Sequence, residues 1–326
     1  MRQSYALRCK LGRLERPDAV NRETLARRRD SLKALAALAF SAALPRTAGA
    51  ATAAALERPI PATGERIPAV GMGTWLTFDV APGPGRDARL AVLREFFAGG
   101  GTLLDSSPMY GYAEAVLGDL VPKAKPARVF NATKVWTPTR FLGVRQMEES
   151  FAHWGLRRFD LMQVHNMLDW ETHLVTLKEW KAAGRIRYLG ITTSHGRRHG
   201  DLEAAMKRER FDFVQFSCSF ADRDAERRLL PLAAERGAAV IVNRPFDGGD
   251  LFDAVKGKPL PGWAPEIACA NWAQVFLKFV VSHPAVTCAI PATSNPAHMR
   301  ENMGALAGPL PDAALRRRMA ADFDRL

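Results

Sequence analysis

The sequence predicts an α/β fold, a closed (β/α)8 TIM barrel preceded by an N-terminal β-hairpin. Short apolar runs typical of buried strands alternate with segments of helical apolar spacing, giving eight strand–helix units. Alternating strands and helices require a parallel sheet. No Gly-x-Gly-x-x-Gly follows the first expected strand, which favours a closed barrel over a doubly wound dinucleotide-binding sheet.

The expected elements follow from apolar spacing and from Gly and Pro stops. A hairpin is expected over 57–68, with its turn at 62–65. The expected strands are 69–75, 102–105, 128–133, 159–164, 187–191, 211–216, 238–242 and 286–290. The expected helices are 86–98, 113–121 (ended by Pro122), 139–154, 170–183, 200–208, 225–236, 271–282, 296–306 and 311–323. The linker 245–264 is rich in Gly and Pro and reads as irregular.

Composition is that of an ordinary globular chain, and the charge is unevenly distributed. Of 326 residues, 47% are hydrophobic and 25% charged, with a formal net charge of +12. Residues 1–50 hold 11 Lys and Arg against 4 Asp and Glu, and the rest hold 35 against 30. The body is therefore only mildly basic, and we expect no nucleic-acid binding.

Cysteine and histidine spacing predicts no metal site. Cys9, Cys218, Cys269 and Cys288 form no Cys-x-x-Cys pair, and neither His-x-His nor His-Glu-x-x-His occurs. We expect buried thiols, and the spacing disfavours a metal hydrolase on the same fold.

Residues 1–50 are expected to be an export signal. A basic segment, 26–33, precedes an apolar run of about 11 residues at 34–44, which is too short to span a bilayer. Ala48-Gly49-Ala50 reads as a cleavage site, and 28–33 resembles the twin-arginine export motif. We therefore expect recognition by the twin-arginine translocase, cleavage near Ala50, no stable membrane span and a periplasmic location. The alternatives are a general secretory signal and an ordinary amphipathic helix.

Two further expectations follow from this segment. Its basic part is unusually long and no Met lies between Met1 and Met72, so one hypothesis is that translation starts at Val20. Residues 51–326 are expected to form one barrel domain, and a monomer is the default.

Titratable side chains recur at the ends of three successive expected strands. Asp105 ends the second strand, Lys134 ends the third 29 residues later, and His165 ends the fourth 31 residues after that. About 30 residues is one strand–helix unit, and the carboxyl ends of barrel strands share one rim. Tyr110 follows Asp105 on a Pro/Gly turn and can fold back over it.

These four residue types together can protonate a carbonyl oxygen. A tyrosine hydroxyl has a pKa near 10 and is a poor acid at neutral pH. We expect Lys134 to lower the pKa of Tyr110, and Asp105 to keep the lysine charged and oriented. His165 can hydrogen-bond a substrate carbonyl. The alternative is a structural Asp105–Lys134 ion pair in a barrel without catalysis.

From 57 to 306 the chain resembles the aldo-keto reductase superfamily. The matching stretches are 71–75, 105–111 with Glu114 and 117–118, 133–134, 160–165, 290–291 and 301–302. The family's Asp-Tyr-Lys-His tetrad maps onto Asp105, Tyr110, Lys134 and His165. The resemblance implies a nicotinamide cofactor across the barrel mouth and hydride delivery to an aldehyde or ketone, with Tyr110 as general acid.

The resemblance also implies binding residues. For the cofactor these are Gly73, Thr74, Asp105, Ser194, Gln215, Asn243, Thr293, Ser294, Glu301 and Asn302; for the apolar wall of the substrate pocket they are Trp75, Trp136 and Met167. Asn243 stands where the family often has a stacking aromatic, and His195 where it usually has Asn. Ala292 and His298 stand where NADP-selective members place Lys and Arg. Thr293, Ser294 and Arg300 remain to contact a phosphate, Arg300 only if it turns inward. NADP is expected, with NAD as the alternative.

The sequence thus predicts an NAD(P)H-dependent oxidoreductase acting on a small carbonyl substrate. The alternative is a non-catalytic nicotinamide-binding barrel that acts as a redox sensor or an accessory subunit.

Overall fold

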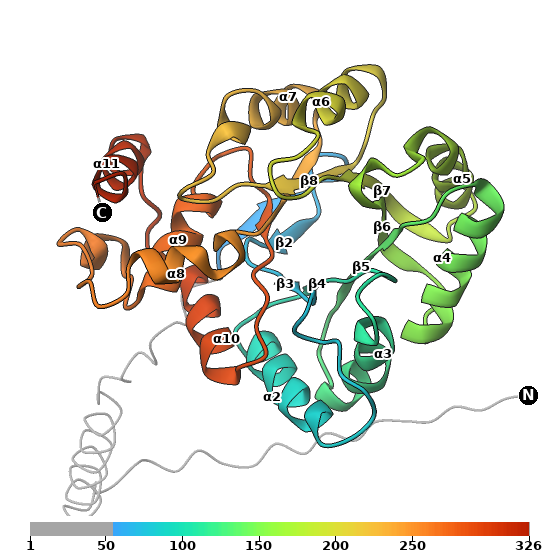
Figure 1. Cartoon of the computed structure of the whole chain (residues 1–326), viewed down its shortest axis with the longest axis horizontal. Helices are drawn as coiled ribbons and strands as arrows, with labels where there is room; N and C mark the ends of the chain where they lie inside the picture. The colour runs from blue at the N-terminus through green and yellow to red at the C-terminus, as the bar shows by residue number, and fades with distance from the viewer. Residues whose placement is uncertain (1–54, 326) are drawn as a thin grey trace, which may run out of the picture. The chain divides into compact units, whose positions relative to one another are not determined.

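The structure, a computed structural model, describes residues 55–325, so the expected signal at 1–50 and the cleavage near Ala50 lie outside the described residues. Eight parallel strands stand in sequence order around a ring, with helices outside it (Figure 1). The strands are β3 Met72–Gly73, β4 Leu103–Asp105, β5 Phe130–Val135, β6 Phe159–Val164, β7 Ile186–Thr192, β8 Phe213–Ser217, β9 Ala239–Asn243 and β10 Cys288–Ala289.

Backbone bonds between the first and last strands complete the ring. Val70 bridges Ala289 and Gly73 bridges Ala292, both in parallel. Gly71 N donates to Ala289 O at 2.8 Å. Gly71 suits this approach because a Cβ there would lie 2.9 Å from the Leu103 carbonyl oxygen. The predicted (β/α)8 barrel is confirmed.

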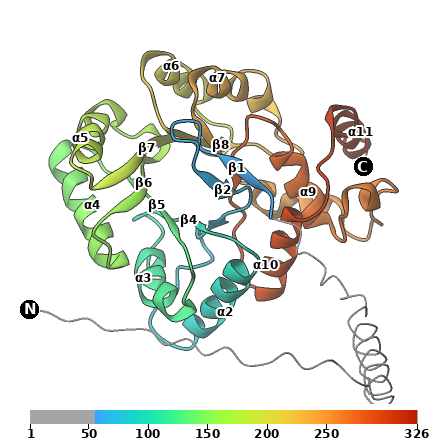
Figure 2. The same ribbon diagram turned by 180° about the vertical axis from the view of Figure 1, so that it is seen from behind.

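Helices cover the outside of the barrel and bury the apolar outer faces of its strands. They are α2 Gly85–Ala98, α3 Ala113–Ala124, α4 Arg140–Trp154, α5 Trp170–Ala182, α6 His199–Arg208, α7 Leu229–Arg236, α8 Asp250–Ala254, α9 Trp272–Val281, α10 Pro296–Met303 and α11 Ala313–Phe323. In both ribbon views α11 lies at the edge of the ring beside α9 (Figures 1 and 2).

The predicted hairpin closes one end of the barrel, as the view from behind shows (Figure 2). Its strands, β1 Glu57–Pro59 and β2 Arg66–Pro68, are antiparallel. Ile60 and Ile67 are fully buried in one cluster with the barrel-interior side chains Leu103, Phe130, Leu161, Tyr188 and Phe213. Tyr188 Oη donates to Glu65 Oε2 at 2.7 Å, which fixes the hairpin turn to β7. Side chains therefore fill the barrel interior at the hairpin end, and only the opposite end of the barrel is free to form a site.

Several element boundaries differ from the prediction. The first and last barrel strands are two residues each, shorter than 69–75 and 286–290, because isolated bridges replace a continuous ladder there. Helix α3 continues past Pro122 to Ala124. A proline so near the end of a helix removes only one backbone bond, and Lys125 in the left-handed region ends the helix instead. The linker 245–264 contains α8, which its Gly and Pro content masked.

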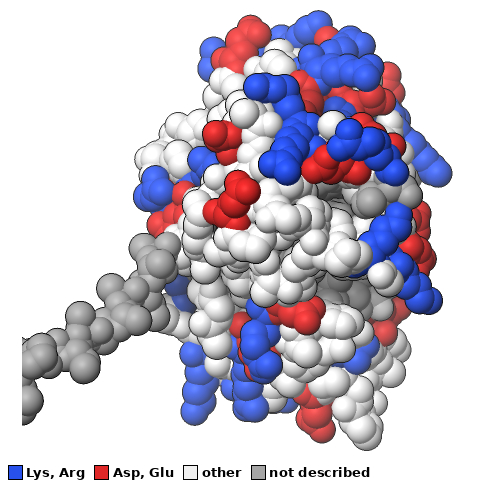
Figure 3. Space-filling model, turned by 90° about the vertical axis from the view of Figure 1, so that its left-hand side faces the viewer, with Lys and Arg blue, Asp and Glu red and all other residues white. Residues whose placement is uncertain are grey.

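The surface carries charges of both signs. On the face in Figure 3, basic and acidic side chains are interspersed, with a broad uncharged area between them. Many form exposed pairs, such as Arg208 with Glu171 and Lys178 with Glu209. Among residues 55–325, no helix has the length and apolar character needed to cross a membrane. The same residues contain no cluster of three or more His, Cys, Asp or Glu placed to hold a metal ion.

Candidate active site

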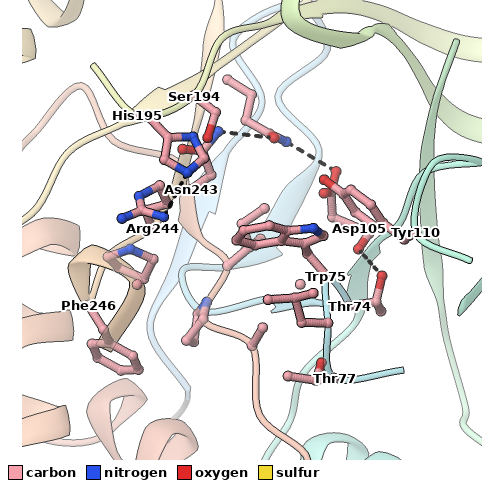
Figure 4. A pocket seen from close by; sticks show the side chains of 18 of the residues that line it. Thr74, Trp75, Thr77, Asp105, Tyr110, Ser194, His195, Asn243, Arg244 and Phe246 are labelled. Atoms are coloured by element: carbon pink, nitrogen blue, oxygen red, sulfur yellow. Dashed lines mark hydrogen bonds between the residues drawn. The ribbon is translucent and has the colours of Figure 1, made fainter. Parts of the chain in front are cut away.

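A cavity of about 350 Å³ opens at the carboxyl ends of the barrel strands. This lies within the usual range for ligand pockets. The residues expected for the site that line it are Gly73, Thr74, Trp75, Asp105, Tyr110, His165, Ser194, Gln215 and Asn243. In Figure 4, Asp105 and Tyr110 lie on one side of the cavity, and Ser194, His195 and Arg244 lie on the other.

A buried ion pair lies beneath the cavity. Lys134 Nζ is 2.5 Å from Asp105 Oδ2, and neither side chain is more than 2% exposed. Lys134 Nζ also donates to Ser106 O at 2.8 Å. Burial lowers the pKa of Lys134, but the Asp105 carboxylate and Tyr110 outweigh it, so the pKa of Lys134 is raised overall. The lysine therefore stays charged at the floor of the site.

Tyr110 lies over this pair, on the loop between β4 and α3. The Lys134 Nζ atom is 5.1 Å from the centroid of the Tyr110 ring. Burial raises the pKa of Tyr110 and Asp105 adds to the effect, while Lys134 opposes it. The net shift is upward, so the expected lowering is wrong in sign, because desolvation of the phenolate outweighs the charge of the lysine. Tyr110 is therefore protonated at neutral pH.

His165 follows β6 and lies beside Tyr110. The two rings meet edge to face, with centroids 5.7 Å apart. The His165 Nδ1 atom is 3.0 Å from Ser107 Oγ, which leaves Nε2 for a ligand in the cavity that His165 lines. Burial, helped by Lys134, holds the pKa of His165 well below 6.5. The imidazole is therefore neutral.

Two glutamine amides hold the other oxygen of Asp105. Gln163 Nε2 donates to Asp105 Oδ1 at 3.0 Å and Gln215 Nε2 donates to the same atom at 3.1 Å. Sequence reasoning missed Gln163. It lies two residues before His165 on β6, and the two-residue period of a strand could have placed it on the inward face.

Asn243 continues this network across the barrel. Its Nδ2 donates to Thr193 O at 2.8 Å and to Gln215 Oε1 at 3.4 Å, and its Oδ1 accepts from Ser217 Oγ at 2.9 Å. Asn243 therefore fixes Gln215 from the side away from Asp105. No aromatic ring stands at this position, as the sequence indicated.

Arg244 brings a positive charge to the opposite wall, and sequence reasoning missed it too. Its Nη1 is 3.0 Å from His195 Nε2, and its Nη2 is 3.3 Å from Asp247 Oδ1. Burial and then Arg244 lower the pKa of His195, so Nε2 can accept from the guanidinium. Trp75 meets the His195 ring edge-on at 6.0 Å. The backbone of Arg244 has a φ of +50°. The spacing of apolar residues does not predict such a left-handed conformation in a loop, so it could not predict where the Arg244 side chain lies.

The remaining predicted residues do not line this cavity, and two of them were expected in the substrate pocket. Trp136 is 40% exposed, and its ring centroid is 6.5 Å from that of His165, so it lies at the edge of the site. Met167 is 3% exposed and packs into the outer core.

The others belong to the segment after β10. Thr293 Oγ1 accepts from Asn295 N, and Asn302 is buried within α10. Ser294 and Glu301 are exposed and do not line the cavity. Arg300 does not turn inward: its guanidinium donates to both oxygens of Glu95 on α2, at 2.6 and 3.0 Å.

Comparison with known proteins shows which family the sequence matches. Residues 69–321 match the aldo/keto reductase family. The pyridoxal 4-dehydrogenase of Microbacterium luteolum is 24% identical over 331 aligned positions, covering 78% of this chain and 94% of the relative.

Solved structures share the fold. An aldo/keto reductase from Klebsiella pneumoniae in complex with NADP and acetate superposes with a TM-score of 0.68, at 24% identity, covering 80% of this chain and 93% of its own. The glycerol dehydrogenase of Gluconobacter oxydans gives 0.66 at 18% identity, covering 82% and 94%. The family match spans most of the chain and the barrel carries the expected tetrad at its rim, so the chain belongs to the aldo/keto reductase family.

Proposed function

We propose that the protein is an NAD(P)H-dependent oxidoreductase that reduces an aldehyde or ketone, with Tyr110 as the proton donor. The observation that carries this proposal is the placement of Tyr110 over the buried Lys134–Asp105 pair, next to neutral His165 and facing the cavity. Membership of a family of oxidoreductases supports it.

The cavity residues fit the nicotinamide part of such a cofactor. The Ser194 hydroxyl has no hydrogen-bond partner within residues 55–325, so it can bond a ligand amide. Gln215 and Asn243 supply amides next to it, and the Arg244 guanidinium suits an anionic phosphate. A Cβ at Gly73 would lie 3.0 Å from Ile290 O, so glycine at this position lets the segment after β10 approach closely at this wall of the cavity. When bound, the reduced nicotinamide supplies the hydride.

The preferred nucleotide is NADP, with NAD as the alternative. Two structures of aldo/keto reductases from Klebsiella pneumoniae, both 24% identical, contain NADP or NADPH, which favours NADP. The Arg300–Glu95 pair leaves Arg300 engaged elsewhere, which keeps NAD as an alternative.

The proton chemistry follows from the protonation states. Because its pKa is raised, Tyr110 keeps its proton until negative charge develops on the substrate oxygen. The phenolate then formed lies beside the Lys134 ammonium, which stabilises it, and Asp105 holds that ammonium in place. His165 Nε2 orients the carbonyl by a hydrogen bond.

The test is oxidation of NADPH and of NADH by the purified protein with a broad panel of aldehydes and ketones. We expect turnover with at least one carbonyl, and none without it. Nucleotide binding without turnover across the panel would instead support the non-catalytic, sensor-like alternative.

We further propose that residues 1–50 direct twin-arginine export of a protein already loaded with its cofactor, and that the mature protein is periplasmic. The motif at 28–33, the apolar run and Ala48-Gly49-Ala50 support this. Replacing Arg28 and Arg29 by Lys should retain the precursor in the cytoplasm, whereas Arg46→Lys should not. Export of the double variant at the wild-type level would contradict the proposal.

A further inference from the structure

Three inward-facing side chains form a polar layer across the barrel. Asp105, Gln163 and Gln215 come from β4, β6 and β8, which are alternate strands, and each is at most 2% exposed. The side chains two residues earlier on the same strands are Leu103, Leu161 and Phe213, which pack in the apolar interior cluster. Barrel layers are usually filled by bulky apolar residues. The presence of three polar side chains in this layer, one layer above an apolar one, therefore needs a specific explanation.

The explanation lies in the hydrogen bonds of Asp105. A carboxylate oxygen only accepts, so each amide must turn its nitrogen to Oδ1. The distances from Oδ1 to the amide nitrogens of Gln163 and Gln215 are 3.0 and 3.1 Å. The other oxygen, Oδ2, is 2.5 Å from Lys134 Nζ. The amides thus fix the rotation of the carboxylate that aims Oδ2 at the lysine.

The two glutamines are not equivalent. Gln215 lines the cavity and also bonds Asn243, so a bound ligand can compete for its amide. Gln163 does not line the cavity and is 0% exposed. Its Oε1 accepts from Gln215 Nε2 at 3.3 Å. Gln163 therefore acts on the site only through its protein neighbours.

We propose that Gln163 is a positioning residue, which holds Asp105 against Lys134 whether or not a ligand engages Gln215. The inference rests on the proposed function. Lys134 Nζ is held by Asp105 and by Ser106 O. Releasing Asp105 Oδ1 lets the carboxylate rotate and shifts the ammonium that faces Tyr110.

The test compares Gln163→Met with Gln163→Glu over a range of pH. Gln163→Met fills the space but donates no hydrogen bond, and we expect kcat to fall by about ten- to hundredfold at every pH. Gln163→Glu is similar in shape. Burial and the Asp105 carboxylate raise the pKa of this glutamate, so it donates to Oδ1 while protonated and repels Asp105 once it ionises at higher pH. The ratio of kcat for Gln163→Glu to that for Gln163→Met should therefore rise as pH falls.

Two further variants keep the test decisive. Gln163→Asn has too short a reach to Asp105 and adds no volume, so we expect it to behave like Gln163→Met if the latter folds poorly. Ser150→Ala removes a neutral donor from a different buried carboxylate, Glu114, and should leave kcat unchanged. In every variant the KM for the carbonyl should change little, because Gln163 does not line the cavity.

The inference is overturned if Gln163→Met and Gln163→Asn keep the wild-type kcat. It is also overturned if Gln163→Glu and Gln163→Met differ by the same factor at every pH. These results differ from failure of the proposed function, in which the wild-type protein itself shows no carbonyl-dependent nucleotide oxidation.

Discussion

Burial sets the protonation states of the two rings that face the cavity. It raises the pKa of Tyr110 despite the nearby lysine and lowers the pKa of His165. At neutral pH both rings are therefore uncharged: the Tyr110 phenol keeps its proton, and His165 carries a proton on one ring nitrogen only. This arrangement suits proton donation by Tyr110 and orientation of a carbonyl by His165.

The neutral His165 has a consequence for stability. Its folded-state pKa lies well below 6.5, its usual value, so below that pH the unfolded chain takes up a proton that the folded chain refuses. Stability is therefore lost as pH falls from about 6.5 towards 5, by up to about 1.4 kcal/mol per pH unit for one such group. His165→Gln should flatten the fall in the free energy of unfolding, measured in urea at each pH.

A second histidine gives the matched control. The Glu114 carboxylate, whose Oε2 lies 3.9 Å from His153 Nδ1, raises the pKa of the exposed His153, so protonation of His153 favours the folded state as pH falls. His153→Gln should not flatten the fall and should slightly steepen it. An unchanged slope in His165→Gln would contradict the assignment of a neutral His165.

At the residue level, spacing placed Asp105, Lys134 and His165 at one rim because one strand–helix unit repeats about every 30 residues. The Pro/Gly turn after Asp105 placed Tyr110 over them. Spacing did not find Gln163, since a glutamine does not titrate and draws no attention as a candidate. Nor did it find Arg244, whose direction depends on a left-handed backbone in a loop. Met167 was expected in the pocket but is buried in the outer core. The two-residue period of a strand thus predicts which side chains point into the barrel, whereas the sequence pattern does not predict the backbone conformation of a loop.

The hairpin β1–β2 contributes stability away from the chemistry. Its side chains pack on Leu103, Phe130 and Leu161 at the amino-terminal part of the strands, while the tetrad lies at their carboxyl ends. Ile67 is fully buried in this cluster. The hairpin therefore seals the barrel without contributing a residue to the cavity.

Shortening Ile67 should separate stability from activity. Ile67→Ala should lower the free energy of unfolding by about 2–5 kcal/mol, and Ile67→Val by about 0.5–1.5 kcal/mol, through lost burial and cavity formation. Both should leave kcat near the wild-type value under conditions where the protein is folded. Urea unfolding and steady-state kinetics measure the two effects. A loss of kcat that grows with the loss of stability would refute this separation.

Element boundaries were predictable where apolar runs were long. Strand β6 was predicted at its observed bounds because four of its six residues are apolar, and the structure buries all four of them. Strands β3 and β10 were predicted too long, since the bridges that close the barrel depend on partners more than 200 residues away. Helix α8 was missed because it has only five residues and follows two glycines.

For the molecule as a whole, the fold and the family were both readable from sequence. Eight alternating units fix a parallel sheet, and the recurring polar ends fix a shared rim. The substrate class at finer resolution depends on the loops around the cavity, including 245–264, whose conformation follows from tertiary contacts such as those of Phe246 and Phe252 with Phe276. Under the proposed function, the barrel strands hold the tetrad, while residues of 245–264 line part of the cavity in which a substrate would lie.

The measurement that tests the central claim most directly is a comparison of Tyr110→Phe with the wild-type protein. Both turnover with a carbonyl and binding of NADPH, followed by its fluorescence, should be recorded. The account predicts that Tyr110→Phe lowers kcat by about 10²–10⁴-fold, because the proton donor is lost, while the Kd for NADPH changes little. Tyr110→Phe that turns over at the wild-type rate would contradict it.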